Sequence, residues 1–329
     1  MRGLSILLLV QTACAAGFAH NLPFGELGRP FRPGTNLVVF WNAPTNELPA
    51  DVWVYRVLPS HFSPAVISNL TVLGSFTEKD RSRTPALNPV FNQPGGLMYR
   101  SADGNRELYI FPNLGWIYYD DAAVSSSHTT NGVPKAESET LDLAIGYLKQ
   151  FGIDRSQLAT KPQSADLAAS YIVGKLTVFD TNKTHFTFVN LRGVMVARKI
   201  DGVDFWAKGT RDGFNMTFGP EGKVARLEIL WRRLKRDAAY RTATAEEFME
   251  WIRNGKAVLD DAGMEDFDWS SARKITVNHV TPYYYGREHD VVQDWAYPFA
   301  MLEATVETRT TNQTVYLCCP IIDESKTGK

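Results

Sequence analysis

The chain from Ser170 to Arg233 alternates apolar and polar residues with a period of two, and this pattern constrains the fold more than any other feature of the sequence. Because residues two apart lie on the same face of a strand, the alternation predicts strands with one buried and one solvated face. Turn-forming pairs at Asp201-Gly202 and Asp212-Gly213 separate the runs. We therefore predict an antiparallel meander. Its clearest apolar positions are Phe214, Met216, Phe218, Ala225, Leu227, Ile229 and Trp231.

Three helices are predicted, each ahead of a strand-rich segment. Ser63 supplies a capping hydroxyl, and the proline after it suits the first helical turn. The segment from Glu137 is amphipathic, and Thr244 with Glu247 forms a capping box. The order of helix followed by strands therefore recurs three times. We predict an α+β fold of repeated helix-plus-antiparallel-meander units, with the helices packed on twisted antiparallel sheets.

The chain also divides by composition. Residues 122–135 are rich in Ser, Thr and Asn, which is typical of a linker. We therefore expect an N-terminal α+β domain at 35–121 and a larger C-terminal α+β domain at 136–325.

The first residues have the organisation of a secretory signal peptide. Arg2 precedes a short apolar run from Leu4 to Val10, and small residues follow at Ala13-Cys14-Ala15. This predicts a signal peptide over residues 1–19 and a secreted, periplasmic or extracellular protein. Lipid attachment at Cys14 is an alternative that would anchor it. The apolar run is shorter than the roughly 20 residues that a transmembrane helix needs, and no transmembrane segment is expected.

Overall charge and the rarer residue types narrow the classes of function. The formal net charge is −1, which argues against nucleic acid as a partner. The six histidines form no closely spaced pair of metal-ligand type, so we predict no metal site and no cofactor. Cys318 and Cys319 are adjacent, and adjacent strand residues point to opposite faces, so the fold does not depend on a disulfide framework.

Several segments follow one another in an order that matches a known family: Val196–Val203, the turn at Gly219–Gly222, the strand ending at Trp231, the helix Ala245–Asn254 and the stretch Trp295–Phe299. Through these segments, about half of the chain resembles the extracytoplasmic PepSY-like and YycI-type domains of bacterial envelopes. The resemblance implies a modulator, inhibitor or sensor that binds another envelope or extracellular protein without enzymatic activity. An earlier piece, Val52–Val57 and the helix after it, looks like a degenerate first copy.

A cluster of aromatic and charged residues near the C-terminus is the main candidate binding surface. Tyrosine, tryptophan and arginine give recognition surfaces a large contact area with few rotatable bonds. The predicted partner-binding residues there are Tyr283, Tyr284, Tyr285, Arg287, His289, Trp295 and Tyr297. Arg232 and Arg233 begin a second, basic patch that suits an acidic partner.

Two other functions stay open. Glu288, His289 and Asp290 could supply acid and base groups to a secreted hydrolase. A structural component of the envelope is the third class, although the chain has no low-complexity repeats. The sequence favours an exported protein that binds rather than catalyses.

Overall fold

The structure, a computed structural model, describes residues 29–32, 36–44, 48–82, 94–161, 164–179, 185–207, 212–259, 271–308 and 311–322. The predicted signal peptide at 1–19 and the alternative lipid anchor at Cys14 lie outside the described residues.

The predicted α+β class is wrong, because the described part of the chain is mostly β. Within the described residues, seventeen strands form a 14-stranded sheet and a 3-stranded sheet. The three predicted helices are present as α2 (Pro64–Leu73), α4 (Glu137–Gln150) and α5 (Ala245–Arg253), but they do not begin separate repeats. The strands that follow α2 and α4 instead join edge to edge. Such joining satisfies backbone N–H and C=O groups that two separate meanders would leave exposed at their edges.

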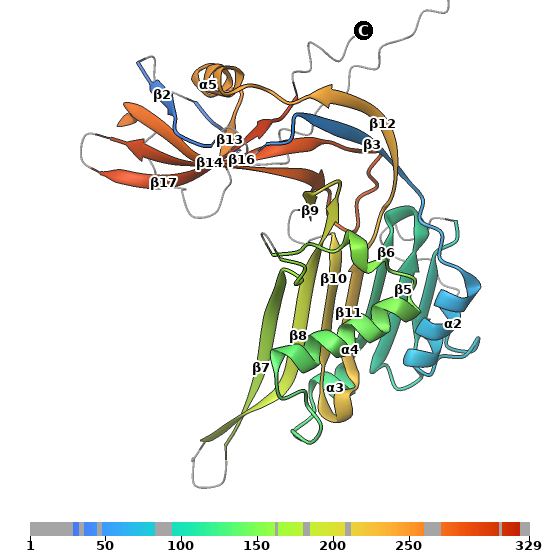
Figure 1. Cartoon of the computed structure of the whole chain (residues 1–329). Helices are drawn as coiled ribbons and strands as arrows, with labels where there is room; N and C mark the ends of the chain where they lie inside the picture. Colours follow the sequence, from blue (N-terminus) through green and yellow to red (C-terminus); the bar gives the residue numbers. More distant parts are fainter. Residues whose placement is uncertain are drawn as a thin grey trace, which may run out of the picture.

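The central half of the molecule, residues 64–230, is an antiparallel sheet with α2 and α4 on one face (Figure 1). Leu108, Ile117 and Leu227 of the sheet are fully buried against Leu70 of α2 and Ala144 of α4. This half also contains the short helix α3 (Ala122–Ser125). Its strands are β4 (Leu97–Arg100), β5 (Arg106–Phe111), β6 (Trp116–Asp121), β7 (Ala169–Phe179), β8 (His185–Ile200), β10 (Gly213–Phe218) and β11 (Val224–Leu230).

The terminal half combines both ends of the described chain, residues 29–58 and 233–322. Helix α5 packs on it through Phe248 and Ile252, which are both fully buried, and the predicted Thr244–Glu247 capping box is confirmed at its start. Strands β3, β12 and β15 form the small sheet, and the others extend the large one. The strands are β1 (Arg29–Pro30), β2 (Val38–Trp41), β3 (Asp51–Leu58), β12 (Arg233–Arg241), β13 (Val258–Leu259), β14 (Lys274–Gly286), β15 (Trp295–Ala296), β16 (Pro298–Glu307) and β17 (Asn312–Pro320).

The hairpin of β8 and β9 joins the sheets of the two halves edge to edge. The last residues of β8, Arg198–Ile200, pair with β9 (Val203–Ala207), and β9 pairs in parallel with Tyr283–Gly286 of β14. In Figure 1, β9 lies between the central strands and the terminal sheet. Because β8 is 16 residues long, the same strand reaches from the core of the central half to the junction.

The division into halves does not coincide with the boundary predicted from composition. The predicted linker at 122–135 separates β6 from β11 in the sequence, yet these strands pair over Trp116–Asp120 and Arg226–Leu230. The described residues from 36 to 58 lie in the terminal half instead of a domain at 35–121.

Candidate functional site

The hairpin turn between β8 and β9 places charged residues at the junction of the two halves. Ile200 pairs with Val203, so the turn consists of Asp201 and Gly202 alone. Both have a positive φ, 50° and 84°, as two-residue hairpin turns of the primed type require. The turn predicted at this position is confirmed. It aims Asp201 away from β8 and toward β3 and β12 of the terminal half.

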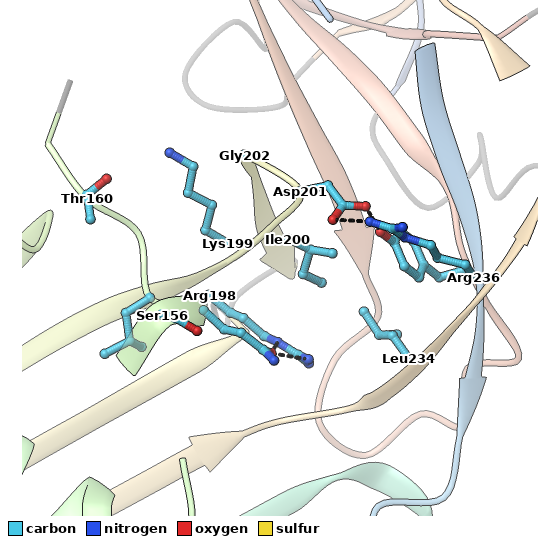
Figure 2. A pocket seen from close by; sticks show the side chains of 12 residues that line it. Ser156, Thr160, Arg198, Lys199, Ile200, Asp201, Gly202, Leu234 and Arg236 are labelled. Carbon is cyan, nitrogen blue, oxygen red and sulfur yellow. Dashed lines mark hydrogen bonds and ion pairs between the residues drawn. The ribbon is translucent and has the colours of Figure 1, made fainter. Parts of the chain in front are cut away.

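A pocket of ≈ 550 Å³ lies beside this turn. The central half contributes residues of β8 and of the segment after α4, and the terminal half contributes β3 and β12. Figure 2 shows Asp201 against Arg236 on one side, with Arg198 and Ser156 across from them. The lining residues are Tyr55, Ser156, Gln157, Leu158, Thr160, Arg198, Lys199, Ile200, Asp201, Gly202, Leu234 and Arg236.

Arg198 forms the inner wall of the pocket and is 5% exposed. Its Nε and Nη2 atoms donate to Gln157 Oε1 at 3.1 and 2.8 Å, and Nη1 donates to the carbonyl of Arg232. Its guanidinium carbon lies 4.5 Å from the centroid of the Trp231 ring. Burial lowers the pKa of Arg198 to about 10, with Asp212 opposing this shift.

The opposite wall is a network of Asp201, Tyr55 and Arg236. The Tyr55 hydroxyl donates to Asp201 Oδ2, and Arg236 Nη2 donates to Oδ1 at 2.7 Å. Burial, together with the hydrogen bond to Asp201, raises the pKa of Tyr55 to about 12. Burial acts to raise the pKa of Asp201 as well, but the hydrogen bonds from Tyr55 and Arg236 outweigh it and lower that pKa. Asp201 is therefore an ionised residue that already has its partners.

Behind Arg198 lies an ion pair that is almost fully enclosed. Arg232 Nη1 is 2.6 Å from Asp212 Oδ1, and their side chains are 2% and 0% exposed. Burial raises the pKa of Asp212 to about 6 against the opposing charges of Arg232 and Arg198. Arg232 also donates to the carbonyls of Arg287 and Glu288, at 2.5 and 3.1 Å. The sequence predicted Arg232 in a basic surface patch, but this residue is buried and connects the two halves. Arg233 is exposed on β12.

The predicted aromatic surface is mostly core. Tyr283, Tyr284 and Tyr285 are 5%, 1% and 6% exposed, and Tyr297 is 6% exposed. Tyr283 and Tyr285 pack in the core of the terminal half, while Tyr284 lies on the other face of β14 in a separate cluster. Trp295 is half-buried under the guanidinium of Arg56, 5.2 Å from its ring centroid. Docking a partner requires exposed rings, and four of these five aromatic residues do not provide them.

The loop after β14 holds the remaining predicted residues. Arg287 is half-buried, and its backbone N–H donates to Gln293 Oε1 at 2.9 Å. His289 lies against Trp116 of β6, with the ring centroids 4.3 Å apart. Within the described residues, His289 Nδ1 and Asp290 Oδ1 are enclosed and have no hydrogen-bond partner. This loop therefore packs onto the central half, and the structure does not bring it into the junction pocket.

The residues that line the junction pocket were not among those predicted from the sequence. One signal was present: Arg198 follows Val194 and Val196 at intervals of two, so it occupies a core-facing position of its strand. A charged residue at a position reserved for the core marks a site or an internal ion pair. The partners from β3 and β12 could be identified only once the topology was known.

Cys318 and Cys319 are both buried, and neither forms a disulfide with another cysteine that the structure describes. The described residues contain no cluster of three or more metal-ligating side chains. Among the helices that the structure describes, none has the length and hydropathy needed to cross a membrane.

Comparison with known proteins gives little further information. No family model and no curated protein matches this chain. Among solved structures, it is similar to an uncharacterized protein from Eubacterium rectale ATCC 33656, at 9% sequence identity and a TM-score of 0.47, over 89% of this chain and 90% of the other. This similarity is too low to carry an argument about fold or function.

Proposed function

We propose that this chain is an exported, non-enzymatic protein that binds a small molecule in the junction pocket. The observation that carries the proposal is the origin of the pocket's lining: residues of both halves converge on one space of ≈ 550 Å³. Binding sites for small molecules occur preferentially between structural units, with volumes of roughly 300–1,000 Å³. The lining also combines apolar residues, such as Leu158 and Leu234, with a few fixed polar groups, which is typical of ligand sites.

The polar groups of the pocket are held in place before any ligand arrives. The Ala159 N–H donates to the Ala197 carbonyl at 2.8 Å, which holds the segment containing Leu158 and Thr160 against β8. Asp154 accepts from the Ser156 N–H at 2.8 Å and so caps the 3₁₀ turn Arg155–Gln157. Preorganised groups bind more tightly because less conformational entropy is lost on binding.

Native mass spectrometry of the full chain, purified from its own host, tests this function. We expect a small-molecule adduct that is lost from Thr160→Trp, because a large ring at this half-buried lining position fills the pocket. Thr314→Trp, at an exposed position of β17, is the matched control and should retain the adduct. Thermal unfolding with a chemically diverse ligand set extends the test, since a bound ligand raises the midpoint. Folded protein with no adduct and no midpoint shift would contradict the proposal.

A protein partner is a second candidate function, favoured by the surface of β12. This strand is at the edge of the small sheet, and its Arg233, Lys235 and Arg241 are exposed. An exposed strand edge can accept a further strand, and its charges here would select an acidic segment. Chemical cross-linking in the native host tests it: a partner captured by the wild type should be lost from the triple change of these residues to Ser.

A further inference from the structure

The lining of the junction pocket has more positive than negative side chains. Three of its lining residues, Arg198, Lys199 and Arg236, are cationic, and a single one, Asp201, is a carboxylate. That carboxylate already accepts hydrogen bonds from Tyr55 and Arg236. The two cations that remain are adjacent in the sequence, and neither forms an ion pair with a carboxylate that the structure describes.

Arg198 is the more unusual of the two because it is almost completely buried. A buried charge is unfavourable unless it is paired and hydrogen-bonded. The acceptors of Arg198 are an amide oxygen of Gln157 and a backbone carbonyl, which are both neutral. A guanidinium has five N–H groups. Three hydrogen bonds from the Arg198 guanidinium go to described residues. Two N–H groups therefore remain for another acceptor.

The nearest buried carboxylate is already paired. The Asp212 carboxylate is 2.6 Å from Arg232. It accepts no hydrogen bond from the Arg198 side chain, so it acts on that guanidinium through its charge alone. The cluster of Arg198, Arg232 and Asp212 consequently carries one more positive than negative charge. Lys199 adds a second positive charge at the pocket wall.

We infer that the ligand is a small organic oxyanion, a carboxylate or a phosphate ester, whose charged group binds Arg198 and Lys199. This inference rests on the proposed function of the pocket. Arginine pairs with such groups through two parallel N–H···O hydrogen bonds, and lysine adds a point charge. The hydroxyl groups of Ser156 and Thr160 line the same pocket and can donate to further oxygens.

The rest of the ligand is apolar in part. Leu158, Ile200 and Leu234 line the pocket beside the charged groups. A bound apolar group gains free energy in proportion to the area that it removes from water. The site therefore matches a molecule with an anionic head and an apolar body, rather than a free inorganic ion.

The inference is tested by measuring how tightly the full chain binds three probes, with calorimetry or ligand-observed NMR. The probes are octanoate, octanamide and inorganic phosphate. We expect octanoate to bind at least about tenfold more tightly than octanamide, which has the same body without the charge, and more tightly than inorganic phosphate. Affinity should fall as salt is added, because salt screens the charge of the half-buried Lys199 and weakens the attraction of the anion to the pocket. Equal affinity for octanoate and octanamide would overturn the inference, and so would tighter binding of inorganic phosphate.

Variants of Lys199 test whether the anionic group binds in this pocket. Lys199 is chosen because it is half-buried, whereas Arg198 is almost fully buried and hydrogen-bonded within the fold, so replacing Arg198 would also affect stability. Lys199→Gln should weaken octanoate binding by about tenfold, and Lys199→Arg should restore it. Lys175→Gln, an exposed position of β7 outside the pocket, makes the same charge change and should have no effect. If both glutamine variants bind octanoate equally, the assignment to this pocket is wrong.

These outcomes separate the inference from the function on which it rests. A neutral or cationic ligand found by native mass spectrometry, and displaced by Thr160→Trp, would overturn the oxyanion while leaving pocket binding intact. The absence of any adduct or midpoint shift, together with no binding of the three probes, would overturn both.

Discussion

Arg232 Nη1 lies 2.6 Å from Asp212 Oδ1, and at most 2% of either side chain is exposed. The pair connects the residue before β10 to the segment between β11 and β12. Arg232 also donates a hydrogen bond to the carbonyl of Arg287, in the loop after β14. Through Arg232, this ion pair holds the central half and the terminal half together. Removing one partner of such a pair leaves the other charge buried and unpaired.

Arg232→Met should therefore lower the free energy of unfolding by about 3–5 kcal/mol. Arg233→Met is the matched control, because its side chain is exposed on β12, and it should change stability by no more than about 0.5 kcal/mol. Urea denaturation of both variants measures the difference. Equal stability of the two variants would show that the buried pair does not fasten the halves.

Stability should fall in acid because of Asp201. Hydrogen bonds from Tyr55 and Arg236 lower its pKa from the ordinary value of 3.8. A carboxyl group with a lowered pKa in the folded state contributes stability above the unfolded pKa, and this contribution is lost as the pH falls through the folded value. Asp201→Asn should flatten this part of the pH dependence, measured by urea unfolding from about pH 5 downward. Asp237→Asn, an exposed residue of β12, is the control. If Asp201→Asn loses stability in acid as steeply as the wild type, the hydrogen bonds from Tyr55 and Arg236 do not stabilise the ionised Asp201.

Gly115 should tolerate no side chain. Its φ is 66°, and an added Cβ would lie 2.7 Å from the carbonyl oxygen of Trp231, where the backbone crosses toward β12. Gly104 has a similar φ of 72° but open space around it. Gly104→Ala should cost about 1–2 kcal/mol from its left-handed backbone alone, and Gly115→Ala clearly more. Thermal unfolding distinguishes them, and a smaller loss in Gly115→Ala than in Gly104→Ala would show that the crossing adapts.

Tyr284→Ala should lower the stability of the fold, because the ring is part of the core and is not a binding surface. The ring is 1% exposed and packs against Tyr55 at 5.3 Å and Phe205 at 6.1 Å between centroids. Truncating a buried aromatic residue costs about 3–5 kcal/mol. Tyr316→Ala, on a ring that is 46% exposed, should have a small effect. A stable, folded Tyr284→Ala protein with altered binding would restore the recognition role predicted from the sequence.

The tyrosines show where sequence reasoning reached its limit. A period of two indicates which residues of a strand share a face, but it does not show whether the second face is also covered. At Tyr284 it is covered, because Tyr55 of β3 and Ala296 of β15 lie on that side. Three consecutive aromatic residues therefore all point into protein. The sequence contained no local signal for this, since the covering strand β3 is more than 200 residues away.

Local signals were more successful than long-range ones. The caps at Ser63 and Thr244 and the turn at Asp201-Gly202 were all predicted, because each depends on neighbouring residues. The pairing of β6 with β11 was not, and it is this pairing that replaces repeated units with one large sheet. The junction pocket was missed for the same reason, because its two walls come from segments that are distant in the sequence.

The interleaved order of the two halves has a consequence for how the molecule is made. β3 pairs with β12 and β15, so the strands synthesised first meet their partners only when the last third of the chain exists. Pairing across such separations is intrinsically slow, and until it happens β2 and β3 are unprotected strands that can associate with other chains. An N-terminal fragment should therefore aggregate or require a chaperone. Any continuous segment that contains both β3 and β15 must also include the whole central half.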